Sequence, residues 1–114
     1  MQILITGRHI EITEDLQKRL ESRIEAIFAD TTLKVSSVRV VLDLEKSRCR
    51  ADLVAYVKHC DPFAATSQGY DVIKVIDDVT NKLQAQISKY IDRVQEHRGP
   101  SLHDLEEKEA VESI

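Results

Sequence analysis

Hydrophobic and polar residues alternate in several stretches of the chain, which predicts β-strands. Residues 2–7 alternate, are rich in β-branched types and end at Gly7. In residues 38–44 the even positions are apolar, and in residues 49–57 the odd positions are. This period of two is typical of strands that bury one face. Residues 62–66 predict a short fourth strand at a sheet edge, because Pro62 cannot donate a hydrogen bond to a neighbouring strand.

A two-residue turn at Lys46 and Ser47 would join the second and third strands as a hairpin. Burial and charge pairing then agree with one register. The predicted pairs are Leu44 with Cys49 and Leu42 with Ala51 on the inner face, and Glu45 with Arg48 and Asp43 with Arg50 on the outer face.

Two other stretches carry apolar residues at helical spacing. The first has Thr13 as a suitable N-cap, with Glu14 and Asp15 at the positive end of the helix dipole, and should end near Asp30. The second runs from about Tyr70 to residue 97, where the sequence Gly99-Pro100 ends it.

The element order β-α-β-β-β-α predicts an α+β fold, in which a four-stranded mixed sheet carries two parallel helices on one face. The first crossover should be right-handed, so the first two strands are parallel. One core is expected between the sheet and the helices. Its predicted members are Leu16, Leu20, Ile24, Val40, Leu42, Leu53, Ile76, Leu83 and Ile87.

The length of 114 residues predicts one domain, which we place at residues 1–98, followed by an acidic tail at residues 99–114. One of the 16 Lys and Arg residues and five of the 20 Asp and Glu residues lie in the tail. The net charge of −4 therefore belongs to the tail, and the folded part is neutral overall. A basic face can exist there if the acids gather elsewhere.

The start of the chain lacks the pattern of a secretory signal, and the apolar runs are too short to span a bilayer. We therefore expect a cytoplasmic protein with no membrane partner. The two cysteines, Cys49 and Cys60, are too few for a disulfide framework and should remain thiols.

No glycine-rich phosphate loop, nucleophile elbow or Cys-x-x-Cys pair is present, so we expect no enzyme and no cofactor. His59, Cys60 and Asp61, with Cys49 nearby, form the one cluster that resembles a metal site. Because adjacent strand residues point to opposite faces, an ordinary loop is the favoured interpretation. His9 is interpreted as a surface histidine without a partner.

Charges on the two helices are sorted in the helical-wheel projection. Lys82, Lys89 and Arg93 fall within about 40° of one another beside the apolar stripe of the last helix. The acids of that helix, Asp77, Asp78, Asp92 and Glu96, are placed away from them. Arg19 and Arg23 flank the stripe of the first helix, with its acids Glu14, Glu21 and Glu25 across it. Such side chains either shield the edges of the core or contact phosphates.

In this topology at most one basic flank can line the groove between the helices, and the other should face outward at an edge. Aromatic residues make up only 4% of the chain, and Tyr56 is the lone aromatic residue on the outward face of the hairpin. Recognition of RNA backbone and shape is therefore favoured over the reading of unstacked bases.

The chain resembles the ribosome hibernation-promoting factors and ribosome-associated inhibitors, also called the sigma-54 modulation protein family, in their short form. The resemblance covers about residues 1–98 and is clearest at residues 5–13, ITGRHIEIT. It continues in Val40-Val41-Leu42 and Glu45-Lys46, and in Asp71, Ile76-Asp77, Lys82-Leu83 and Gln86 on the last helix.

The resemblance implies binding in the tRNA and mRNA cleft of the small ribosomal subunit, which blocks translation and promotes hibernation under stress or in stationary phase. It implies rRNA phosphate contacts from Arg19, Arg23, Lys82, Lys89 and Arg93. Small-subunit rRNA is the expected partner, with ribosomal proteins left open and no DNA expected. Whether such a factor pairs ribosomes or silences single ones stays open.

The sequence departs from the family pattern on the last helix. Ile73 stands where the family usually has tyrosine, and Lys74 and Val75 stand where it has small residues. The lysine run at the end of the helix is also thinner, which predicts weaker rRNA affinity or another target. Two alternatives of other classes remain: a protein-interaction module that acts on another cytoplasmic factor without RNA, and a small enzyme that uses the loop of His59, Cys60 and Asp61.

Overall fold

The structure, a computed structural model, describes residues 1–98 and only the backbone for residues 95–98. The elements in chain order are β1 (Gln2–Arg8), α1 (Glu14–Ala29), β2 (Val35–Glu45), β3 (Arg48–Val57), β4 (Phe63–Gly69) and α2 (Val72–Arg98). The predicted acidic tail and the predicted stop at Gly99-Pro100 lie outside the described residues. Within those residues, no helix is long and apolar enough to cross a membrane.

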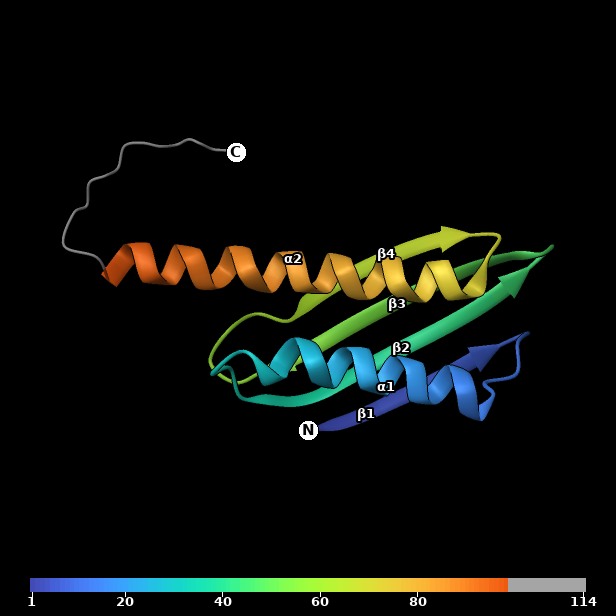
Figure 1. Cartoon of the computed structure of the whole chain (residues 1–114), viewed down its shortest axis with the longest axis horizontal. Coiled ribbons are helices and arrows are strands. Elements are labelled where there is room, and N and C mark those ends of the chain that lie inside the picture. The colour runs from blue at the N-terminus through green and yellow to red at the C-terminus, as the bar shows by residue number, and fades with distance from the viewer. Residues whose placement is uncertain (99–114) are drawn as a thin grey trace.

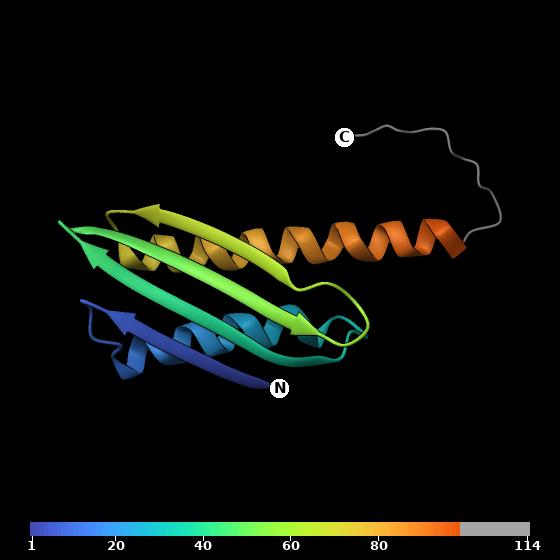
Figure 2. The ribbon, with the colours of Figure 1, turned by 180° about the vertical axis from the view of Figure 1, so that it is seen from behind.

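The strands form one mixed sheet in the order β1-β2-β3-β4. β1 is parallel to β2, and the other neighbours are antiparallel. Both helices run in the same direction over one face of the sheet (Figure 1), and the view from behind shows the other face uncovered (Figure 2). The predicted α+β fold with two parallel helices on one face is therefore confirmed.

The hairpin between β2 and β3 has the predicted register, with Leu44 paired to Cys49 and Glu45 to Arg48. Lys46 and Ser47 form its turn with φ of 51° and 67°. Two successive residues with positive φ give a turn whose twist matches that of the flanking strands. The alternating pattern and the turn thus fix the same pairing, although neither turn residue is a glycine.

The predicted boundaries of the fourth strand were wrong. β4 begins at Phe63, one residue after Pro62, and continues to Gly69, where the prediction ended at Thr66. The polar end of the strand resembles a loop in sequence, but Gly69 pairs with Cys49 and Ser67 is buried against α2. The predicted edge position of this strand is confirmed.

The helix starts follow from two capping residues. Thr13 caps α1, since its Oγ1 accepts a hydrogen bond of 3.2 Å from the Leu16 backbone N–H. Asp71 caps α2, since its Oδ1 accepts from the N–H of Ile73 at 3.0 Å. Tyr70 therefore lies before the helix, in the connection from β4, and not in its first turn as predicted.

The predicted core is confirmed. Of its nine members, eight are buried and Leu16 is partly buried against them. The stripe on α2 packs against the core as far as Ile91, and the ring of Tyr90 meets that of Phe63 edge-on with centroids 5.6 Å apart. The last part of α2 projects past the end of the sheet (Figure 1).

Truncation of Leu83 tests this core, because the side chain is fully buried. Leu83→Ala should lower the free energy of unfolding by about 2 to 5 kcal/mol through lost transfer energy and the cavity left behind. Urea unfolding of both proteins measures the difference. Leu4→Ala, at a position 46% exposed on β1, is the control and should cost far less. Equal effects would contradict the assigned core.

Candidate nucleic-acid interface

Arg19 of α1 crosses the groove between the helices to reach Asp77 of α2. Its Nε donates to Asp77 Oδ1 at 3.0 Å, and its Nη2 donates to Oδ2 at 2.8 Å. The hydrogen bond from Arg19, with the nearby charge of Arg23, holds the pKa of Asp77 below its usual value. The same bond raises the pKa of Arg19. This bidentate pair fixes the Arg19 guanidinium while its Nη1 makes no hydrogen bond within the described part of the chain.

Arg23 lies one turn further along α1 and is held by two polar side chains of α2. Its Nε donates to Thr80 Oγ1 at 2.7 Å, and its Nη2 donates to Asn81 Oδ1 at 2.9 Å. Thr80 is fully buried, and its hydroxyl lies 3.0 Å from the Ile76 carbonyl oxygen. A hydroxyl can donate to a carbonyl and accept from Arg23 at the same time. Sequence reasoning missed Thr80, although a polar residue within the apolar stripe of α2 was a visible signal.

The predicted separation of acids from the basic flank of α2 was wrong for Asp78 but not for Asp77, which faces α1 instead. Besides the Arg19 pair, Asp77 Oδ1 lies 3.4 Å from Arg23 Nε. Asp78 Oδ2 lies 3.5 Å from Lys82 Nζ on the adjacent turn. Asp78 and Lys82 are four residues apart on one helix, and residues at that spacing are neighbours on the helix surface, so the prediction should have paired them. Asp92 is exposed, and the side chain of residue 96 lies outside the described residues.

Lys82 lies on the opposite side of α2 and binds the edge strand. Its Nζ donates to the carbonyl oxygen of Thr66 at 2.8 Å, and Gln86 Nε2 donates to that of Ala64 at 2.6 Å. Edge strands present unpaired backbone groups that natural proteins cover. The two side chains provide such a cover for β4. One basic flank thus lines the groove between the helices and the other faces outward at an edge, as predicted.

Lys89 and Arg93 continue the line of Lys82 toward the end of α2, at intervals close to whole helical turns. Both are exposed, and neither makes a hydrogen bond or ion pair with residues 1–94. We call Lys82, Lys89 and Arg93 the basic row. Its last two members can receive an external anion without losing a contact to residues 1–94.

Two open hollows meet at the arginines of the groove. One, of about 480 Å³, is lined by residues that include Lys18, Arg19 and Ser22. The other, of about 220 Å³, lies between the helices and is lined by residues that include Asn81 and Gln84. Arg23 lines both hollows, and each hollow also has one aspartate in its wall, Asp15 in the first and Asp30 in the second.

The remaining candidate residues lie away from this surface. His9 was predicted to lack a partner, but its Nδ1 lies 3.1 Å from Asp43 Oδ1. In the described part of the chain, no three His, Cys, Asp or Glu side chains come together as a metal site. Cys49 and Cys60 are free, as predicted, and burial raises the pKa of the Cys49 thiol.

The fold and sequence together define the class of this protein. Residues 3–95 match the family described as Sigma 54 modulation protein / S30EA ribosomal protein. The match spans most of the chain, so the chain belongs to this family.

Several relatives in this family are named ribosome hibernation promoting factor. The protein of Escherichia coli strain K12 is 30% identical over 99 residues, which cover 85% of this chain and 100% of the relative. That of Klebsiella oxytoca is 31% identical over 100 residues with the same coverage. That of Pseudomonas putida is 23% identical over 95 residues, which cover 83% of this chain and 91% of the relative.

Solved structures share the fold. A ribosomal subunit interface protein from Coxiella burnetii superposes with a TM-score of 0.72 at 23% identity, covering 81% of this chain and 99% of that one. The N-terminal domain of Protein Y from Thermus thermophilus gives 0.72 at 21% identity, covering 79% and 99%.

Acid should weaken the fold through Asp77. Because its pKa is lowered in the folded state, the unfolded chain binds more protons below about pH 4, where an ordinary aspartate titrates. The stabilisation is complete above that pH and is lost as pH falls through the lowered pKa. Asp77→Asn should therefore lower stability near neutral pH and show a smaller acid-induced loss.

Urea unfolding at several pH values between about 3 and 7 measures this effect. Asp92→Asn is the control, since it removes an exposed carboxylate from the same helix. Acid sensitivity that is the same in Asp77→Asn and the unaltered protein would contradict the role of the Arg19 contact.

Proposed function

We propose that this protein is a translation inhibitor that occupies the tRNA and mRNA cleft of the small ribosomal subunit and promotes ribosome hibernation under stress or in stationary phase. The observation that carries the proposal is the basic row, whose last two members, Lys89 and Arg93, have no acidic partner in residues 1–94. The names of the relatives support a ribosomal target. The proposed place of action is the cytoplasm, and the protein acts by binding, with no catalytic residue.

The proposed contacts are charge-assisted hydrogen bonds from five side chains to rRNA phosphates. Lys89 and Arg93 use none of their donors on residues 1–94. Lys82 has three N–H donors, one of which is used on the Thr66 carbonyl. Arg19 and Arg23 keep Nη1 for a phosphate while Asp77, Thr80 and Asn81 hold the rest of each guanidinium. A donor already held in place loses less rotational freedom when it binds.

The acids of the folded part are compatible with this surface because several are already paired. Asp77 is bound by Arg19, Asp78 by Ser67 and Lys82, and Asp52 by Arg50. A paired carboxylate repels a phosphate less than a free one does. The neutral charge of residues 1–98 therefore does not argue against an anionic partner.

The salt dependence of binding to purified small subunits tests the proposal. Each phosphate contact releases counterions, with a slope of about 0.9 per contact for duplexes. Lys89→Ala and Arg93→Ala should each flatten the dependence by about one contact and leave the melting temperature unchanged. Arg19→Ala and Arg23→Ala should flatten it similarly but also lower the melting temperature, because they remove contacts between the helices.

Glu21→Gln and Asp92→Asn are matched controls on the same two helices. They remove charge from faces placed away from the RNA, so they should change affinity only through screened long-range repulsion. Binding that is insensitive to salt, or equal losses from controls and basic variants, would favour the alternative of a protein-interaction module. A series of salt washes separates the two functions. A protein held by phosphate contacts leaves the ribosome with the steep salt dependence expected for those contacts, whereas a protein-interaction module does not show that dependence.

Deletion of residues 101–114 tests the role of the acidic tail. This segment carries five acids and one base, so rRNA should repel it along any shared path. The shortened protein should bind small subunits as well as the full chain, or slightly better at low salt. A large loss of affinity in the same cosedimentation assay would instead mean that the tail makes specific contacts.

A further inference from the structure

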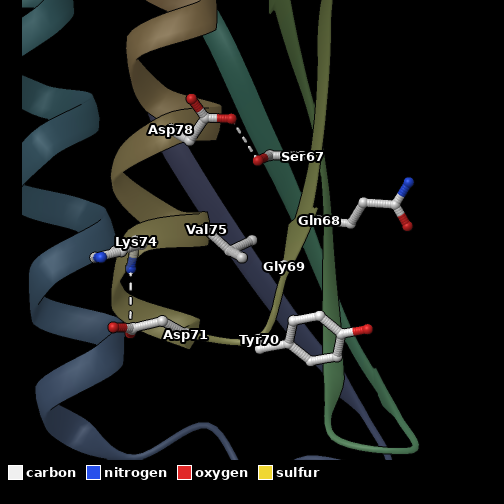
Figure 3. A pocket seen from close by; sticks show the side chains of 8 residues that line it. All are labelled: Ser67, Gln68, Gly69, Tyr70, Asp71, Lys74, Val75 and Asp78. Atoms are coloured by element: carbon white, nitrogen blue, oxygen red, sulfur yellow. Dashed lines mark hydrogen bonds between the residues drawn. The ribbon is translucent and has the colours of Figure 1, made fainter.

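A hollow of about 470 Å³ lies at the start of α2, on the same edge of the molecule as the basic row. The end of β4, from Ser67 to Tyr70, forms one wall, and the first turns of α2 form the other with Val75 and Asp78 (Figure 3). Lys82 lies on the next turn after Asp78 and donates to Thr66 on the same strand. The basic row therefore begins one turn beyond the hollow and continues along α2 from there.

Tyr70 is the most exposed large hydrophobic residue of the described chain, at 76%. It lies outside the helix, and Figure 3 shows its ring directed away from α2, on the same side as Gln68. Arg48 of β3 places its guanidinium carbon 5.9 Å from the ring centroid. A cation at this distance from a tyrosine ring is attracted by its π electrons and helps to orient it. The result is an oriented aromatic surface that no core residue covers.

The charges around the hollow favour a neutral ligand group over a phosphate. Asp71 and Asp78 both line it, against one cation, Lys74. Asp71 accepts from the backbone N–H of Ile73, and Asp78 Oδ2 accepts from Ser67 Oγ, a bond that lowers the pKa of Asp78. The two carboxylates, set against one ammonium, offer a phosphate no net attraction. They can accept hydrogen bonds from the exocyclic amino groups of a base.

We infer that one unstacked nucleobase of an RNA strand stacks on Tyr70 at the rim of this hollow, while the phosphates of that strand contact the basic row. The inference rests on the proposed function and adds a base contact to a surface otherwise suited to backbone recognition. Arg48 is then placed to meet a phosphate next to the stacked base. The rise of α2 puts Val72 and Lys82 about 15 Å apart, so one strand can follow both features.

Replacement of Tyr70 separates stacking from charge. Base stacking on an aromatic side chain contributes affinity without releasing counterions. Tyr70→Ala should weaken binding to purified small subunits by about 5- to 150-fold and leave the slope with salt unchanged. Tyr70→Phe should retain the affinity, because the ring is kept. Tyr56→Ala, at the other strongly exposed tyrosine, is the matched control and should bind normally.

A fluorescent reporter tests the contact directly, since the chain contains no tryptophan. In the full chain, Tyr70→Trp should be quenched when small subunits are added, because a stacked base quenches an indole. Tyr56→Trp, on the outer face of β3, should keep its emission. Ultraviolet cross-links from Tyr70→Trp should fall on rRNA.

Three results would overturn the inference. The first is normal affinity of Tyr70→Ala while Lys89→Ala still flattens the salt dependence, which leaves the proposed function intact. The second is cross-linking of position 70 to a ribosomal protein alone, which would replace the base by a protein contact. The third is binding that is insensitive to salt and to Lys89→Ala, which would remove the proposed function and this inference together.

Discussion

The polar contact between the two helices is the constraint on which the candidate interface depends. Each helix packs on the sheet through its own apolar stripe, and Arg19 and Arg23 join them by binding Asp77, Thr80 and Asn81. A bidentate arginine pair fixes both distance and angle. This contact therefore sets the spacing of the helices and the direction of two cationic side chains at once.

The same contact divides the basic residues of the helical face into two kinds. Arg19 and Arg23 are oriented but partly used by internal partners, whereas Lys89 and Arg93 are exposed and make no such contact with residues 1–94. An oriented pair next to an exposed pair suits a ligand with many equivalent phosphates, because orientation gives register and exposed side chains adapt to small shifts. Lys82 belongs to both kinds, since it also covers the edge of β4.

The fold could be predicted from the sequence because one open sheet with helices on a single face leaves a period of two in every strand and one stripe in every helix. The hairpin register followed from Leu44 and Cys49, which must face the core together. The end of β4 escaped prediction because its polar residues pair through the backbone, and a backbone ladder leaves no mark in hydrophobicity. Tyr70 was placed in the helix because the pattern could not show that Asp71 provides the cap.

The topology also predicted that at most one basic flank lines the groove between the helices and that the other faces outward at an edge. It could not predict that Asp77 faces Arg19, because that meeting depends on the register between α1 and α2, which the sheet sets. The five basic residues stand where the wheel placed them on their helices, but their partners Thr80 and Asn81 came only from the structure. The sequence thus predicted the positions of the basic residues on their helices, and the structure shows which of them are bound by side chains of the other helix and which are exposed.

The central claim is that the protein occupies the cleft through which tRNA and mRNA pass. Its most direct test is cosedimentation of the full chain with purified small subunits that are either vacant or loaded with mRNA and tRNA. The account predicts binding to vacant subunits and loss of binding to loaded ones, with tRNA and mRNA displaced when the protein is added in excess. Equal binding to vacant and loaded subunits would contradict it and would place the protein elsewhere on the ribosome.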